Sequence, residues 1–289
     1  MIPQAYLYEW RNHAPWAEMH HVEQDLVLTR AIVELYSDPF FTEAFALRGG
    51  TAMQKLFFDP PIRYSEDIDL VQIRQEPIGQ AFDAIRKHLD PWLGTPKRDR
   101  KRDRMTLYYR FDSEIAPSRT MRLKIEANTD EHFTVLQPLR KKFAVRSEWF
   151  SGEANLLTYQ LEELLGTKLR ALYQRKKGRD LLDLAIALDR FPGLDLEKII
   201  QCFDHYMTHV GAKITRAQFE ANLTAKLSDD YFTTDWAPLL AIGAPAFNAH
   251  AAGEHVRTVL LAPLPGDPWK GPSNKDGSKN QSKTHGHGQ

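Results

Sequence analysis

Two aspartates separated by one isoleucine, Asp67 and Asp69, most restrict what this chain can fold into. Successive side chains of a β-strand alternate between faces, so both carboxylates project together while Ile68 and Leu70 point into a core. Adjacent carboxylates repel one another. A divalent ion such as Mg2+ compensates that charge and prefers hard oxygen ligands. The pattern therefore predicts a strand that presents two acids to a metal ion.

A glycine pair precedes these aspartates by a helix-length spacer. Gly49 and Gly50 lack the Cβ atoms that would hold a backbone away from a phosphate, and Thr51 stands where a helix over 52–58 can begin. The plainer interpretation is a turn, followed by a strand edge whose acids are solvated. The order and spacing of the two halves favour a site for a metal and a nucleotide.

Length, charge and cysteine content limit the number of domains, the binding partners and the compartment. With 289 residues the chain is long enough for two domains. Lys plus Arg and Asp plus Glu each number 38, so any attraction to nucleic acid must come from local patches. Cys202 is the single cysteine, which fits a reducing compartment. No run of 18 apolar residues occurs, so we expect a cytoplasmic protein without a membrane span.

Strand patterns lie in the first half of the chain and helical patterns dominate the second. Amphipathic helices are predicted over 21–36 and 78–88, and strands over 105–111 and 121–128 should form a hairpin. We therefore predict an α+β fold, with a small mixed sheet flanked by helices over 1–145 and a helical C-terminal domain over 146–262. The composition over 263–289 predicts a disordered tail.

The second predicted strand carries a candidate third acid. Met121, Leu123 and Ile125 share one face, which leaves Glu126 on the other. A third carboxylate beside Asp67 and Asp69 would suit a site with two metal ions. A cross-strand ion pair of Glu126 with a lysine or arginine is the alternative. The basic run KRDRKRDR over 97–104 likewise has two interpretations: it is a solvated turn, or it binds RNA phosphates.

A predicted helical hairpin over 161–191 holds a further cluster of charges. Lys168 lies among leucines on the apolar face of the first helix, so its ammonium either extends outward or meets a fixed negative partner, for which a phosphate is suitable. The turn RKKGR follows, and Asp180 opens the second helix. Asp180 and Asp183 are either helix-capping acids or, for Asp180, a functional group that the turn brings near Lys168.

These motifs together resemble a known family. The segments LRGGTAMQKLFF, RYSEDIDL, LKIEAN and ELLGTKLRALYQRKKGRDLLDL are similar to those of the AbiEii/AbiGii-type toxins, which are nucleotidyltransferases of the DNA polymerase β superfamily. The resemblance covers about residues 20–190. It implies a nucleotidyltransferase-like N-terminal domain and an enzyme of a bacterial toxin–antitoxin or abortive-infection system. It further implies a nucleoside triphosphate substrate, Mg2+ or Mn2+, a cognate antitoxin, and RNA, notably tRNA, as the acceptor.

The resemblance also implies roles for individual residues. Asp67 and Asp69 match the catalytic, metal-binding pair, and Lys168 and Asp180 match the essential pair of the helical part. Glu126 stands where relatives often have a third acid. Five further positions match the nucleotide-binding segments: Gly49, Gly50, Thr51, Arg63 and Ser65. Two alternatives stay open, namely transfer to a protein or small molecule, and a nucleotide-binding module without catalysis.

Overall fold

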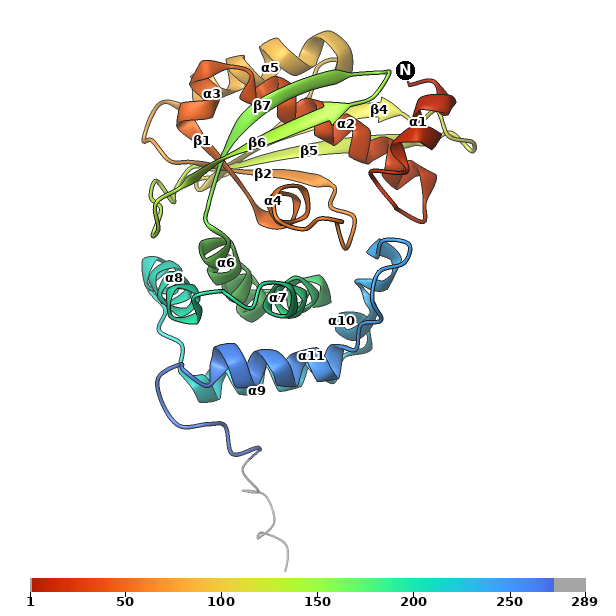
Figure 1. The fold of residues 1–289 in the computed structure, drawn as a ribbon. Helices are drawn as coiled ribbons and strands as arrows, with labels where there is room; N and C mark the ends of the chain where they lie inside the picture. Colours follow the sequence, from red (N-terminus) through yellow and green to blue (C-terminus); the bar gives the residue numbers. More distant parts are fainter. Residues whose placement is uncertain (1, 273–289) are drawn as a thin grey trace, which may run out of the picture.

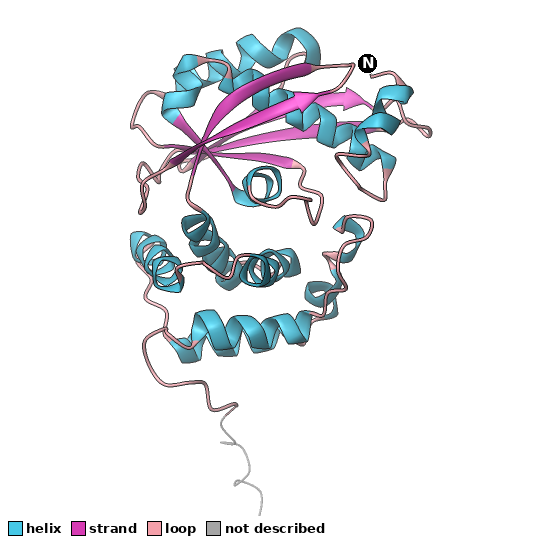
Figure 2. Cartoon of the chain, viewed as in Figure 1, coloured by secondary structure: helices cyan, strands magenta, loops and turns pink. Residues whose placement is uncertain are grey.

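A seven-stranded mixed sheet is the centre of the first half of the chain. The structure, a computed structural model, describes residues 2–272. Over these residues the strands follow the order β3-β4-β5-β2-β1-β7-β6. The predicted α+β class with a mixed sheet flanked by helices is confirmed (Figures 1 and 2). The strands are β1 (Phe45–Arg48), β2 (Asp67–Gln72), β3 (Lys97–Arg100), β4 (Arg104–Asp112), β5 (Thr120–Asn128), β6 (Leu139–Arg146) and β7 (Ser151–Thr158).

Strand β2 lies at the centre of this sheet, antiparallel to β1 and parallel to β5. Its side chains alternate as predicted: Ile68 and Leu70 are buried, whereas Asp67 and Asp69 stay partly exposed. The predicted hairpin is β4–β5. The basic run over 97–104 is more than a turn, because its first half is the fully exposed edge strand β3.

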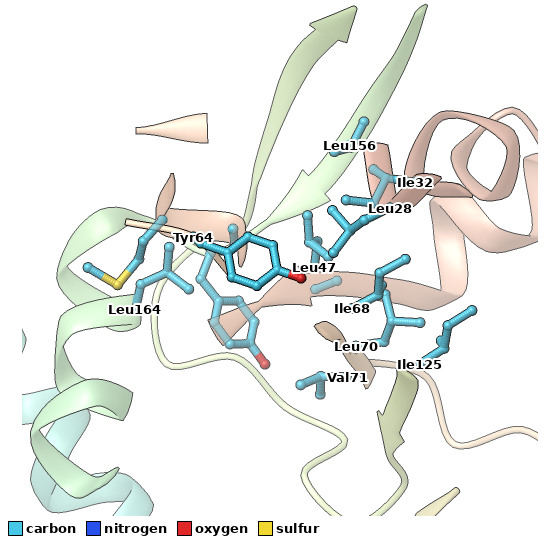
Figure 3. Packing of buried hydrophobic residues seen from close by; sticks show 14 of the residues in the cluster. Leu28, Ile32, Leu47, Tyr64, Ile68, Leu70, Val71, Ile125, Leu156 and Leu164 are labelled. Atoms are coloured by element: carbon cyan, nitrogen blue, oxygen red, sulfur yellow. The ribbon is translucent and has the colours of Figure 1, made fainter. Parts of the chain in front are cut away.

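Helices cover the sheet unequally. α2, α3 and α5 lie over the apolar face, and α4 lies on the face of the aspartates (Figure 1). Leu28 and Ile32 of α2 pack over Ile68 and Leu70 of β2 (Figure 3). The helices of this half are α1 (Gln4–Trp10), α2 (Met19–Tyr36), α3 (Pro39–Ala44), α4 (Gly49–Leu56) and α5 (Ile78–Leu93).

A helical part follows the sheet. Its elements are α6 (Leu161–Gln174), α7 (Gly178–Arg190), α8 (Leu196–His209), α9 (Arg216–Leu227), α10 (Asp230–Thr234), the 3-10 turn η1 (Ala237–Leu239), α11 (Ala249–Val256) and the π-helical turn η2 (Arg257–Leu261). Strands β6 and β7 carry the sheet past the expected boundary at residue 145, because they pair along their whole length. We propose a division between β7 and α6. Within residues 2–272, no helix combines the length and apolar character of a membrane span.

The helical part returns to the sheet near its end. Leu240 forms a β-bridge with Arg63, just before β2. The expected tail over 263–289 does not begin as a free segment, because the amide of Trp269 donates to Glu220 on α9 (2.7 Å) and the carbonyl of Pro265 accepts from the amide of Arg216 (2.9 Å). The remainder of that segment, 273–289, lies outside the described residues.

We predict that Gly166→Ala destabilises the helical part. A Cβ at Gly166 of α6 would lie 2.5 Å from the Cβ of Cys202 and 2.9 Å from the carbonyl oxygen of Ile199 on α8. Because both helices are packed, such overpacking costs about 1–3 kcal/mol. Urea denaturation would measure the loss. Gly79→Ala is the control, since nothing lies within 4 Å of its added Cβ, and an equal loss in both variants would contradict the packing argument.

Candidate active site between the sheet and the helical part

The acids predicted from the sequence lie on one face of neighbouring strands. In the sheet register Asp69 of β2 is flanked by Glu126 of β5 and Arg48 of β1. Asp67 is flanked by Lys124, whose Nζ lies 3.4 Å from Asp67 Oδ2 and 3.1 Å from Glu126 Oε2. The Lys124 ammonium thus contacts two of the acids. As predicted, Glu126 lies on the strand next to Asp67 and Asp69.

The electrostatic state of Asp67 reflects this crowding. The pKa of Asp67 is raised to about 6, chiefly by burial; Lys124 lowers it, and the charge of Asp69 adds to the increase. A carboxyl group with such a pKa is held where negative charge is unfavourable. A positive ligand at this point of the sheet would therefore be bound favourably.

The two glycines at the start of α4 allow side chains of this same site to approach the backbone. Gly49 has a φ of +74°, and a Cβ there would lie 2.3 Å from Asp69 Oδ2. A Cβ at Gly50 would lie 2.4 Å from an Nη atom of Arg63. The sequence predicted that these glycines admit a phosphate. What the structure shows is that they bring the amino end of α4 against Asp69 and the Arg63 guanidinium.

Thr51 and Ser65 connect α4 to the acidic strand. The Thr51 hydroxyl donates to the carbonyl of Asp67 (2.5 Å) and lies 2.9 Å from Ser65 Oγ. Thr51 is fully buried, and Ser65 is partly exposed. Of these two hydroxyls, only that of Ser65 is partly accessible to a ligand.

Arg63 binds another part of the protein. Its guanidinium donates two hydrogen bonds to Asp183 of α7, at 2.7 and 2.8 Å, and a third to the carbonyl of Tyr64. Arg63 is 2% exposed. Gln54 of α4 completes this junction, since it donates to Asp183 and accepts from the amide of Arg63. The structure thus gives Arg63 a carboxylate partner, whereas the sequence comparison assigned it to the nucleotide.

Lys168 also meets protein carboxylates. Its Nζ lies 3.0 Å from Asp180 and 2.9 Å from Asp183, and its side chain is 6% exposed. The helical hairpin therefore brings Asp180 to Lys168 as predicted, and the fixed negative partner of Lys168 is a pair of aspartates. Burial would raise the pKa of both aspartates, but the cations lower it: Lys168 and Arg175 for Asp180, Arg63 and Lys168 for Asp183.

Arg175 is a site residue that sequence reasoning did not single out. Its guanidinium donates to both oxygens of Asp180, at 2.6 and 2.7 Å, yet half of its side chain is exposed. It is close enough to Asp69 for that carboxylate to help raise its pKa, after Asp180 itself. Its place in the turn RKKGR, directly after the helix of Lys168, was the available signal.

A second ionic contact joins the sheet to α6. Glu131 accepts from Arg48 of β1 and from Arg170 of α6, the latter at 2.6 Å. Glu131 is almost fully buried, and its two arginines lower its pKa against the effect of burial. No sequence pattern marked Glu131, because it lies in an irregular segment between strands.

The donor chemistry of the acids suits a hard divalent cation. Mg2+ is commonly held by one or two carboxylates together with substrate phosphates, and the carboxylates of Asp67 and Asp69 match that requirement. Glu126 is already in contact with Lys124 and, at 3.7 Å, with Arg104. Within residues 2–272 no three His, Cys, Asp or Glu side chains converge as a ready-made metal cage. The fit is to an open site completed by the substrate.

Comparisons with known proteins bear on the family and the fold. Residues 30–251 match the model of a family described as nucleotidyl transferase AbiEii toxin, type IV TA system. The fold is similar to that of MenT4, a nucleotidyltransferase toxin from Mycobacterium tuberculosis, with a TM-score of 0.65, 16% identity, and 92% of this chain and 91% of that chain covered. An antigenic nucleotidyltransferase-like protein from Paracoccidioides brasiliensis shares 16% identity at a TM-score of 0.37, over 65% of this chain and 94% of its own. No curated protein matches the sequence.

We predict that Asp183→Asn destabilises the fold at neutral pH. The change leaves Arg63 and Lys168 buried with one carboxylate fewer, and breaking a buried ion pair costs about 3–5 kcal/mol. The lowered pKa of Asp183 means that its contribution is complete above its ordinary value of 3.8 and is lost as the pH falls below that value. Urea denaturation at pH 7 and pH 3.5 should show the difference shrinking in acid. Asp189→Asn on the exposed surface of α7 is the control, and an equal loss there would contradict the prediction.

Proposed function

Because the chain belongs to the AbiEii family of nucleotidyltransferase toxins, which is assigned to type IV toxin–antitoxin systems, we propose that it transfers a nucleotidyl group from a nucleoside triphosphate to RNA, with tRNA as the expected class of acceptor. The reaction is proposed to need Mg2+ or Mn2+. We place it in the bacterial cytoplasm, where both substrates occur, and expect a cognate antitoxin as the protein partner.

One observation carries this proposal. Asp67 and Asp69 project from the central strand beside the amino end of α4, and Arg175 reaches the same region from the helical part. Acids that can hold a divalent ion thus interact electrostatically with a cation that can hold phosphate oxygens. Phosphoryl transfer depends chiefly on such positioning and electrostatic stabilisation.

The chain's own residues would divide the work as follows. The carboxylates of Asp67 and Asp69 hold the cation, and Glu126 is proposed to support it from β5. The amides that follow Gly49 and the hydroxyl of Ser65 face the phosphates. Arg175 binds the triphosphate through its guanidinium, which suits phosphate oxygens.

The bond changes follow from nucleotidyl transfer. A hydroxyl oxygen of the acceptor forms a bond to the α-phosphorus, and the bond from that phosphorus to its bridging oxygen breaks. Pyrophosphate leaves with the electron pair, and the hydroxyl proton is released to solvent. The chemistry that Mg2+ or Mn2+ supplies when bound is to favour ionisation of the attacking hydroxyl and to neutralise the departing pyrophosphate.

Lys168 and Asp180 are proposed to act as positioning residues. Lys168 is buried between Asp180 and Asp183, so its ammonium is already neutralised by protein groups. Asp180 holds the guanidinium of Arg175 through two hydrogen bonds. The pair therefore supports the proposal by fixing the direction of Arg175. Arg63, which also contacts Asp183, is proposed to support the same arrangement from the sheet side.

The acceptor is tested directly by label transfer. The purified protein is incubated with Mg2+, each α-labelled nucleoside triphosphate in turn, and total RNA. Label on RNA is the expected result. Label on protein or on a small molecule would replace RNA as the acceptor, and nucleotide binding without transfer to any acceptor would overturn the enzymatic function.

We predict that Asp69→Asn lowers the rate of transfer about 1000-fold or more, because a metal-held charge contributes several kcal/mol to the transition state. Asp99→Asn is a matched control, since Asp99 continues the register row of Asp69 and Glu126 at the exposed edge strand β3. The rate of label transfer measures both variants. Full activity of Asp69→Asn would remove the metal role.

We predict that Arg175→Gln weakens nucleotide binding about tenfold or more, because a hydrogen bond to a charged group contributes about 1.5–3 kcal/mol. Lys176→Gln is the control in the same turn, since Lys176 pairs with Asp229, the residue before α10, and not with Asp180. Isothermal titration with a non-hydrolysable triphosphate measures both. Equal affinities of the two variants would exclude Arg175 as a phosphate ligand.

A further inference from the structure

A cavity adjoins β2, the strand of Asp67 and Asp69, on the side of β5. The glycine pair lies on the other side of β2, next to β1. This cavity has a volume of about 580 Å³ and opens widely to the surface. Asp67 is part of its wall, together with Glu66. The cavity therefore gives access to Asp67 from the β5 side, whereas the triphosphate is proposed to lie on the β1 side.

Three exposed arginines line this cavity, which we call the arginine cavity: Arg110, Arg119 and Arg122. Arg110 and Arg122 face each other directly across β4 and β5. Like charges directly opposite one another in a sheet are destabilising. Among residues 2–272 none of the three has a carboxylate partner within ion-pair distance, although Arg122 lies over the ring of Tyr108 at 4.9 Å.

The arginines of β6, at the opposite edge of the sheet from β3, are paired. Arg140 contacts Glu43 (2.5 Å) and Arg146 contacts Glu153 (3.0 Å). In the arginine cavity, by contrast, no ion pair within residues 2–272 compensates the three guanidinium groups, although Glu66 and Asp67 line the same cavity. A bound polyanion would supply that compensation.

The opposite wall of the arginine cavity is aromatic. The ring of His21 on α2 stacks on Tyr64, with ring centroids 4.1 Å apart and an interplanar angle of 11°. Tyr64 is buried and His21 is partly exposed on the cavity wall. Gln24, one turn further along α2, donates to the carbonyl of Arg122 (2.7 Å) and so holds α2 against β5.

We propose that the arginine cavity receives a single-stranded segment of the RNA acceptor, with Arg110, Arg119 and Arg122 on its phosphates and the His21 ring stacked on a base. Single-stranded RNA is bound by this combination of basic grooves and aromatic platforms. The inference rests on the proposed function, because it concerns the acceptor of the same reaction. An acidic segment of a protein acceptor could pair with the arginines but would not need a stacking ring. RNA would use both features, because its phosphates pair with the arginines and its bases stack.

The cavity also explains how two polyanions can approach one acidic strand. The triphosphate is proposed to lie beside α4 and Arg175, on the β1 side of β2. The acceptor enters from the β5 side, where Asp67 lines the arginine cavity. An acceptor hydroxyl delivered there would meet the carboxylate pair from the side opposite the leaving pyrophosphate, as in-line displacement requires.

The test compares two double variants that each remove two positive charges. Arg110→Gln with Arg122→Gln alters the cavity, and Arg140→Gln with Arg146→Gln alters the opposite edge. The probe is a fluorescent single-stranded RNA 12-mer of mixed sequence, measured by anisotropy from 50 to 200 mM salt. We expect the cavity variant to bind about tenfold more weakly, with a salt slope reduced by about 1.4. The edge variant should stay within twofold of the wild type.

A second pair of variants tests the aromatic wall. His21→Ala should weaken binding of the RNA 12-mer about fivefold or more, because stacking on the ring is lost. His21→Phe should restore it, since phenylalanine keeps a stacking face. Equal weakening in both variants would overturn the stacking role.

The cavity and the enzymatic function can fail separately. If the cavity double variant binds RNA and uses it as an acceptor as well as the wild type does, the cavity assignment is overturned while the function stands. If the wild type labels no RNA but the cavity variant still loses the 12-mer, the function fails and the RNA site is retained. A melting temperature no lower than that of the wild type, together with unchanged nucleotide affinity, excludes misfolding of the cavity variant as the cause.

Discussion

A buried chain of alternating charges joins the sheet to the helical part at the candidate active site. Arg63 from the sheet half contacts Asp183, Asp183 contacts Lys168, Lys168 contacts Asp180, and Asp180 contacts Arg175. Removing any internal member would leave a charge in a place that water scarcely reaches, which is strongly unfavourable. The orientation of the helical hairpin relative to the sheet, and with it the approach of Arg175 to Asp69, depends on this chain of ion pairs.

The network also divides the cations of the site into two groups. Lys168 and Arg63 are buried and neutralised by aspartates, so they stabilise the fold and are not free to bind a ligand. Arg175 at the end of the network, and the arginines of the cavity beside Asp67, keep exposed guanidinium groups. Positive charge that is fixed but still accessible is what the proposed reaction between two polyanions requires, because it binds phosphates without reorganising.

Several features could be predicted from the sequence because they depend on local periodicity. The alternation at Asp67 and Asp69, the hairpin of β4 and β5, and the pairing of Lys168 with Asp180 across a short turn all follow from residues close together in the chain. Sequence reasoning ended the sheet too early, because the first half of β7 is small, polar and mostly exposed, and only its last three residues are buried. It also missed Glu131 and Arg175, whose partners come from separate elements or an irregular turn.

By itself the sequence determined the chemical types at the site, since two acids at strand spacing, a glycine pair and a lysine on an apolar helix face have few physical uses. Only the tertiary structure decided which of these groups remain free. Arg63 and Asp183 are 120 positions apart, and the ion pair between them requires the helical part to close on the sheet. That closure buries Arg63 and Lys168 and leaves Arg175 exposed, because a charge loses its water only where a partner from elsewhere in the chain replaces it.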